Sequence, residues 1–320
     1  MIRYVLGRGL QAIVVLAVMS FVIYGLIGLM PGDPIDLMIS SDPNMTPADA
    51  ERLRALYGLD RPIVERYGNW ARAALSGDLG YSRLYGAPVL EVMGPALGNS
   101  LQLLATALLL SVAIAVPLGA LAAARPRTTF DYTVNLFAFA GISMPQFWLG
   151  LLLMLLFAVQ LGWLPAGGMA PAGAGLGEQL RYLALPVATL TISAVGGHAR
   201  YVRAAMVETL RQDYVRTARA KGASRARVLW LHALRNAMIP FVTILALDFG
   251  FLFSGALITE TIFAWPGMGK LIFDAILGND YNLALVALLF ATALVLTANL
   301  LADLAYGWLD PRIVVAGGAR

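Results

Sequence analysis

Long uncharged apolar stretches separated by short charged segments dominate the chain. The first runs from Gly9 to Met30, directly after Arg8. At about 1.5 Å per residue, a stretch of this length spans the roughly 30 Å hydrocarbon core of a bilayer. Five more apolar stretches follow, at about 99–123, 132–160, 183–205, 239–262 and 283–306. The pattern predicts an all-α, polytopic membrane protein with six transmembrane helices.

The first stretch has a competing interpretation as a secretory signal peptide, because Arg3 and Arg8 resemble the basic start of one. The apolar part is too long for that class of segment, and Leu29-Met30-Pro31 does not match the small-x-small pattern of a cleavage site. We therefore expect residues 1–30 to form a retained transmembrane helix.

The fourth stretch is the weakest, because its apolar part is short and runs into His198, Arg200 and Arg203. The charges of the loops on either side support a transmembrane helix here better than the length of the stretch does. The loop holding Arg125 and Arg127 and the loop 200–235 are both basic, so both are predicted to be cytoplasmic. The chain must then cross the membrane twice between them, and both termini are predicted to be cytoplasmic.

The polar segment 31–98 is predicted to be a folded external insert of helices. Thr46-Pro47-Ala48-Asp49 reads as an N-cap, a proline at the first helical position and an acid in the first turn, with Gly58 as a stop. A second helix, ending near Gly77, would place four side chains on one face: Ile63, Tyr67, Trp70 and Ala74.

Composition agrees with this organisation. Hydrophobic residues make up 59% of the 320 and charged residues only 13%, against about 25% charged in soluble domains. The absence of cysteine excludes disulfides, thiol catalysis and cysteine-ligated metals, and the two histidines, His198 and His232, exclude a His-rich metal site. The net charge of +4 is explained by basic cytoplasmic loops rather than by nucleic-acid binding. We predict no metal site and no nucleic-acid partner.

The predicted cytoplasmic loop 206–240 is the most informative segment. Glu208 with Arg211 and Asp213 with Arg216 are spaced as i,i+3 pairs on a helix. Gly222 suits the residue after a helix end, and Ser224 suits the N-cap of the next helix. The segment therefore predicts a helix, a tight turn and a second helix, with a surface of small residues that a partner could approach. A solvated basic loop without a partner is the alternative.

The amino-acid sequence of this loop resembles that of a known family. Tyr214–Gly222, with His232–Asn236 and Pro240, resembles the EAA loop of binding-protein-dependent ABC importer permeases, in their dipeptide/oligopeptide (peptide/nickel) branch. Five short motifs support the resemblance in matching order along the chain: Pro31-Gly-Asp-Pro34, Gly77-Asp-Leu-Gly80, Gly141-Ile-Ser-Met-Pro145, Trp265-Pro-Gly-Met-Gly269 and Asp310-Pro-Arg312.

The resemblance implies a type I ABC importer permease fold and the division of the chain into an N-terminal helix (1–30), an external insert (31–98), a five-helix core with the loop 206–240 (99–306), and a cytoplasmic tail (307–320). In the family this loop forms a coupling helix that sits in a groove of the ATPase subunit. Its counterparts here would be Arg216, Thr217, Ala218, Arg219, Ala220, Lys221, Gly222 and Ala223. The Glu-Ala-Ala that names the loop is Arg216-Thr217-Ala218 here, so no role is carried over for that glutamate.

The resemblance also implies the partners: a second homologous permease, two ATPase subunits that hold ATP and Mg, an extracytoplasmic solute-binding protein and the lipid bilayer. The chain itself would need no cofactor. Its place would be the bacterial cytoplasmic (inner) membrane. Relatives in this branch carry dipeptides, oligopeptides, glutathione or nickel complexes, and the sequence does not distinguish these solutes.

Enzymatic functions fit the sequence poorly, and we predict no catalytic residue. Gly267-Met-Gly269-Lys270 departs from a phosphate-binding loop, since Ala264 occupies the first glycine position and Leu271 replaces the Ser or Thr after the lysine. An intramembrane serine protease using Ser254 and His198 is excluded by the predicted topology, which places the two residues at different depths.

A stand-alone secondary transporter that uses Asp248 is the alternative function. An acid within the hydrocarbon is by default a functional group. Asp248 lies only about nine residues into the predicted span, however, so a hydrogen bond between helices or a cap near the cytoplasmic end would also explain it. We find no internal repeat of the kind that secondary transporters show. Ser143 and Pro145 lie where the proline should kink the third span. Such a kink either lines the solute path or serves helix packing. The pathway candidates are therefore Asp248, Ser143 and Pro145.

Overall fold

A computed structural model describes residues 2–29, 46, 48, 52 and 61–309. The described part is almost entirely helical, which confirms the predicted all-α class. Its elements are, in order, α1 (Ile2–Gly28), α4 (Ile63–Leu75), β1 (Tyr81–Ser82), β2 (Ala87–Pro88), α5 (Val89–Ala124), α6 (Thr129–Ser143), α7 (Gln146–Leu153), the π-helical η1 (Met154–Gln160), α8 (Leu176–Thr209), α9 (Asp213–Ala220), α10 (Arg225–Arg227), the π-helical η2 (Val228–Ala233), α11 (Leu234–Ile262), α12 (Met268–Leu277) and α13 (Tyr281–Leu309).

Four helices are long and apolar enough to cross a membrane within the described residues: α1, α5, α8 and α13. The bent pair formed by α6 with α7 and η1 brings the number to five if the pair is a single span. Helix α11 has 29 residues, but some of its side chains lie outside the described part of the chain. The structure therefore supports a multi-pass membrane protein, and the count of six spans stays a prediction.

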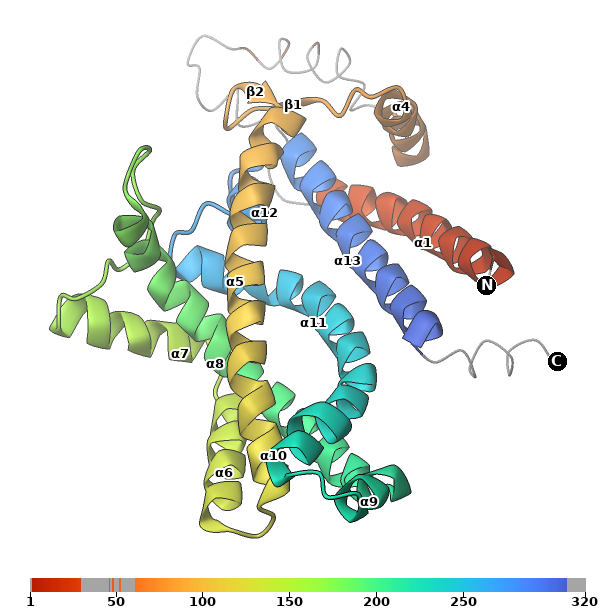
Figure 1. Cartoon of the computed structure of the whole chain (residues 1–320). Helices are drawn as coiled ribbons and strands as arrows, with labels where there is room; N and C mark the ends of the chain where they lie inside the picture. The colour runs from red at the N-terminus through yellow and green to blue at the C-terminus, as the bar shows by residue number, and fades with distance from the viewer. Residues whose placement is uncertain (1, 30–45, 47, 49–51, 53–60, 310–320) are drawn as a thin grey trace.

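Helix α5 is the central element of the bundle. It packs along α8 and also contacts α6, α11 and α12, while α1 packs along α13 (Figure 1). The hairpin β1–β2 and α4 lie at one end of the molecule, and α9 and α10 lie at the opposite end (Figure 1). The segments α4 and α9–α10 are thus separated by the length of the bundle, and the sides of the membrane that they face stay a prediction.

Several helices extend beyond the apolar stretches that predict them. Helix α5 begins at Val89 rather than near 99, because Val89, Met93 and Ala96 are buried in the core. The weakly predicted fourth span is α8, which runs from Leu176 to Thr209. Hydropathy marks the membrane-embedded part of a helix, whereas packing fixes where the helix ends.

The third span breaks at the predicted proline. Met144, the residue before Pro145, has extended backbone (φ −82°, ψ 123°), and α7 begins directly after the proline. The two halves are bent by 100°. Proline lacks an N–H and disfavours helical backbone in the residue that precedes it. The structure thus has a complete break where the sequence predicts a kink.

The second predicted helix of the external insert is α4, which confirms the helix and its end before Gly77 (φ +93°). Tyr67 fixes α4 to α1 through edge-on contacts of its ring with Phe21 and Tyr24, and through a 2.7 Å hydrogen bond between its hydroxyl and that of Ser20. The predicted cap at 46–49 lies mostly outside the described residues, as do Pro31–Pro34 and Asp310–Arg312.

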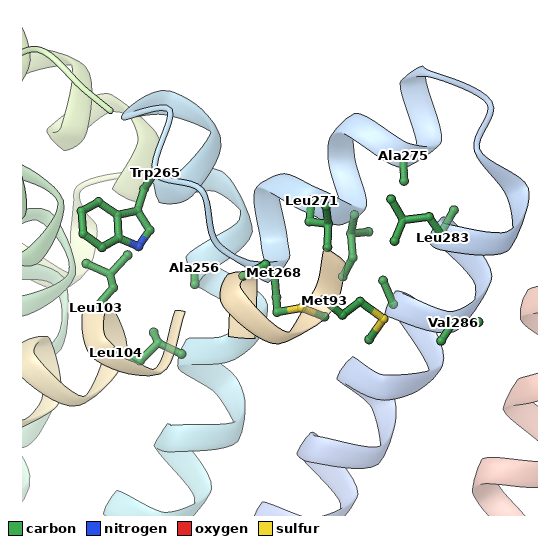
Figure 2. Close-up of a cluster of buried hydrophobic side chains, with 14 of the residues drawn as sticks. Met93, Leu103, Leu104, Ala256, Trp265, Met268, Leu271, Ala275, Leu283 and Val286 are labelled. Atoms are coloured by element: carbon green, nitrogen blue, oxygen red, sulfur yellow. The ribbon is translucent and has the colours of Figure 1, made fainter. Parts of the chain in front are cut away.

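The larger of two apolar clusters lies toward the end of the bundle that carries α4. Figure 2 shows side chains from α5, α11, α12 and α13 meeting in this cluster, with the Trp265 ring over Leu103. The second cluster lies toward α9 and α10 and joins α5, α8, η2 and α11: Ala120, Ala123, Val202, Met206, Leu229, Ala233, Ala237 and Phe241.

Helix α12 is absent from the sequence-based prediction, and Glu260 explains how it is held. The side chain of Glu260 is fully buried and accepts hydrogen bonds from the Ser100 hydroxyl (2.5 Å), the Gly269 N–H (2.7 Å) and the Lys270 N–H (3.1 Å). A side chain on Gly269 would collide with the backbone of Leu257. The glycines of Trp265–Gly269 therefore let α12 approach a buried carboxylate, which gives this motif a structural role.

Candidate functional site

A tight turn links α9 to α10 at the end of the molecule opposite α4. Gly222 has φ +83°, as predicted for the residue after a helix end. The Gly222 N–H donates to the Arg219 carbonyl (3.0 Å) and the Ala223 N–H donates to the Ala218 carbonyl (3.1 Å), which together form a Schellman motif. The Ser224 hydroxyl then accepts from the Arg227 N–H at 3.3 Å, which confirms the predicted N-cap. We call Arg216–Ala223 the elbow.

The elbow presents its side chains to solvent. Six of its residues are exposed, and Ala218 and Ala223 are half-buried. A side chain added to Gly222 would meet nothing within 4 Å. The predicted pair of Asp213 with Arg216 forms at 3.2 Å, but both side chains are largely exposed, so it contributes little stability.

One part of the predicted helix pattern is wrong. Glu208 belongs to the last turn of α8, which ends at Thr209, and α9 starts only at Asp213. Glu208 meets Arg211 through the backbone, where the Arg211 N–H donates to the Glu208 carbonyl at 3.2 Å. The i,i+3 spacing of the charges fits one continuous helix and two separate helices equally well. It therefore could not reveal the break between the two pairs.

The elbow is anchored to the membrane helices from beneath. Val215 of α9 is fully buried, and Val228 and Leu229 of η2 are also buried. Tyr214 is 43% exposed, and its partial burial raises the pKa of the hydroxyl, against a smaller lowering by a hydrogen bond to the Asn236 side chain. The exposed surface therefore rests on a packed base that includes α11.

An ion pair with a buried carboxylate joins α6 to α8. The Arg203 guanidinium donates through Nε to Asp131 Oδ1 (2.5 Å) and through Nη2 to Oδ2 (2.7 Å). The same carboxylate also accepts from the Arg127 N–H (2.9 Å) and from Asn135 Nδ2 (2.9 Å), and the Asp131 side chain is only 3% exposed. Sequence reasoning missed this pair, whose members are 72 residues apart.

The structure brings Asp248, a predicted pathway residue, against His198. His198 Nε2 lies 2.8 Å from Asp248 Oδ2, and the two side chains are 4% and 40% exposed. Asp248 lies at the midpoint of α11, fourteen residues from Leu234 and fourteen from Ile262. Asp248 therefore does not cap α11, and its contact with His198 is a hydrogen bond between α11 and α8. Ser143 and Pro145 are exposed at the break between α6 and α7.

Among the described residues, no group of three His, Cys, Asp or Glu side chains is arranged to hold a metal ion. The buried carboxylates of Asp131 and Glu260 are occupied by the hydrogen bonds given above. The described side chains therefore provide a docking surface at the elbow and charge pairs inside the bundle.

Comparison with known proteins decides the family. Residues 115–315 match the family described as the binding-protein-dependent transport system inner membrane component, and residues 1–108 match the N-terminal part of such membrane components. The chain belongs to this family. It is a permease subunit of an ABC importer, a multi-pass component of the inner membrane that works with other subunits of the transporter.

Relatives match over nearly the whole chain. A putative peptide permease protein of Brucella suis is 41% identical, with 98% of this chain and 100% of the relative covered. The oligopeptide transport system permease protein AppB of Bacillus subtilis is 37% identical (98% and 99%), and the di/tripeptide transport system permease protein DppB of Pseudomonas aeruginosa is 38% identical (91% and 92%).

The fold also matches a solved structure, the crystal structure of an amino acid ABC transporter with histidines. The TM-score is 0.53 at 15% identity, with 68% of this chain and 93% of that chain covered. This similarity confirms the permease fold. Because ABC transporters place ATP hydrolysis on separate ATPase subunits, the chain is a transport component and not an enzyme.

Proposed function

We propose that this chain and a second, homologous permease form a path by which dipeptides, oligopeptides or similar small solutes enter the cytoplasm. An extracytoplasmic solute-binding protein delivers the solute, and two ATPase subunits hold ATP and Mg and drive the cycle. The names of the relatives, which include peptide, oligopeptide and di/tripeptide permeases, support this solute class. Both termini and the elbow face the cytoplasm, and α4 faces outward.

The exposed elbow is the observation that carries the proposal. It combines a tight glycine turn, small side chains and the cations Arg216, Arg219 and Lys221 on one projecting surface. Few and small side chains let a partner approach the backbone closely, and a basic surface favours an acidic groove. The ATPase subunit is the partner that this surface is proposed to take.

The base of the elbow makes it suitable as a lever. The Schellman turn fixes α9 against Ser224, and Val215 is packed beneath α9. From Ser224 the chain continues through α10 and η2 directly into α11. A force applied to the elbow would therefore reach α8 on one side and α11 on the other. If the chain were a stand-alone carrier that uses Asp248, the exposed surface of the elbow would have no partner to bind.

Sidedness provides a direct test, because the chain contains no cysteine that would give background labelling. Cysteine replaces Leu75, which is 91% exposed at the end of α4, or Ala220, which is exposed in the elbow. In intact cells a membrane-impermeant maleimide should label Leu75→Cys and not Ala220→Cys, and opened vesicles should allow both to react. Labelling of both residues from outside would contradict the proposed orientation.

A further inference from the structure

Among the described residues, three helical acids, Asp131, Glu260 and Asp248, bond to a side chain of another helix, and one of them differs from the other two. Asp131 and Glu260 are buried, and both oxygens of each accept hydrogen bonds. Asp248 instead has a side chain that is 40% exposed. Oδ2 contacts His198, and Oδ1 has no hydrogen bond to any described residue. All three acids link helices, but Asp131 and Glu260 use both oxygens, whereas Asp248 leaves Oδ1 without a hydrogen bond to the described residues.

His198 holds that carboxylate in one orientation. The imidazole is 4% exposed, and its two nitrogens contact different helices, with Nε2 at Asp248 Oδ2 (2.8 Å) and Nδ1 at the Ser111 hydroxyl of α5 (3.0 Å). The edge of the Phe241 ring packs against the imidazole, with ring centroids 5.6 Å apart. A network spanning α5, α8 and α11 therefore fixes Oδ2 and turns Oδ1 away from it.

The exposed oxygen indicates what lies beside α11. An ionised carboxylate is costly in hydrocarbon, so acids within membrane helices face a water-filled cavity or a polar partner rather than lipid tails. Asp248 lies at the midpoint of a helix that is itself long enough to cross the bilayer. The face of α11 that carries Asp248 must therefore border a polar space that this chain alone leaves open.

The geometry points to Asp248 as the counter-charge for the ammonium group of a solute at the middle of the path, with His198 as its positioning residue. The inference rests on the proposed function, because peptides are the solutes that carry such a group. An ammonium ion that enters a membrane loses water contacts, and a carboxylate acceptor offsets that loss through a charge-assisted hydrogen bond.

The hydrogen-bond network allows two arrangements of its protons. The Ser111 hydroxyl has one proton and two acceptors in reach, the Leu108 carbonyl (2.9 Å) and His198 Nδ1 (3.0 Å). When the hydroxyl donates to Nδ1, the imidazole is neutral, Nε2–H donates to Asp248, and the network carries one negative charge. A cation beside Asp248 favours this arrangement over the imidazolium form, in which the network is neutral.

The test compares two solutes in the complete transporter. Proteoliposomes holding both permeases, the ATPases and the binding protein are given a peptide with a free amino terminus or its N-acetyl counterpart, each at a concentration that saturates the binding protein. In the Asp248→Asn variant, uptake of the free peptide should fall about tenfold, the effect of one hydrogen bond to a charged group. Uptake of the acetylated peptide should fall less than about twofold.

Two further variants keep the result interpretable. Asp248→Glu retains the charge and should keep the preference for the free peptide, whereas Glu178→Gln removes an exposed acid from the start of α8 and should change neither rate. An equal fall for both peptides in Asp248→Asn would assign Asp248 to helix packing, and unchanged rates would remove it from the path; either result overturns the inference. Failure of the proposed function is separate, because wild-type transporter would then take up neither peptide.

Discussion

Replacing Gly222 by valine should uncouple ATP hydrolysis from transport while leaving the permease inserted and folded. Gly222 has φ +83°, which a β-branched residue adopts only at a cost of about 1–2 kcal/mol. The added methyl groups would enter space that is empty in this chain and that the ATPase surface is proposed to fill. Co-purification of the ATPases should drop, and the binding protein loaded with solute should no longer stimulate ATP turnover.

Gly173 supplies a matched control for this variant. It has φ +84°, is exposed, and would likewise meet nothing within 4 Å if it carried a side chain, but it precedes α8 on the side predicted to be external. Gly173→Val therefore imposes the same backbone strain away from the elbow and should leave ATPase binding intact. If Gly173→Val and Gly222→Val reduce coupling equally, backbone strain explains the effect and the elbow does not.

Replacing Arg203 by methionine should destabilise the permease more than any other single change we propose. The change would leave the Asp131 carboxylate buried without its cation, and loss of one partner of a buried pair costs about 3–5 kcal/mol. The side chain of Arg203 also links α8 to α6. We expect a lower thermal midpoint for the detergent-solubilised complex and a smaller yield of assembled transporter.

Arg200 provides the comparison for Arg203. It lies one turn earlier in α8, is exposed, and stacks over the Phe139 ring at 4.1 Å, a contact worth about 0.5–1 kcal/mol at an exposed site. Arg200→Met should therefore have a small effect on the thermal midpoint. Adding Asp131→Asn to Arg203→Met should recover part of the loss, because it removes the uncompensated charge. Equal midpoints for the two methionine variants would show that the ion pair does not stabilise the bundle.

Much of this architecture could be predicted because lipid imposes it locally. Every lipid-facing segment must be apolar and helical, so hydropathy locates α1, α5 and α13, and the charges of the flanking loops add α8. The turn at Gly222 and the cap at Ser224 could be predicted for a similar reason, since both depend on residues within a few positions of each other.

The long-range contacts could not be predicted in this way. Ser100 and Glu260 are 160 residues apart, and nothing in the neighbourhood of either residue specifies the other. Helix α12 follows from that contact, so it was missed with it. Helix α11 starts at Leu234, before the apolar stretch 239–262 that predicts it, and continues through Pro240 although proline usually marks a helix boundary. Within membranes, neighbouring helices compensate the backbone groups that a proline leaves unpaired.

Photo-crosslinking from the elbow tests the central claim most directly. A photoreactive amino acid replaces Lys221, which is exposed in the elbow, or Leu75, which is exposed on α4 and serves as the control. Illumination of the complete transporter in membranes should join the Lys221 position to an ATPase subunit and the Leu75 position to none. If the Lys221 position forms no adduct with an ATPase subunit in transporter that hydrolyses ATP, the elbow is not the docking surface and the proposed coupling mechanism is wrong.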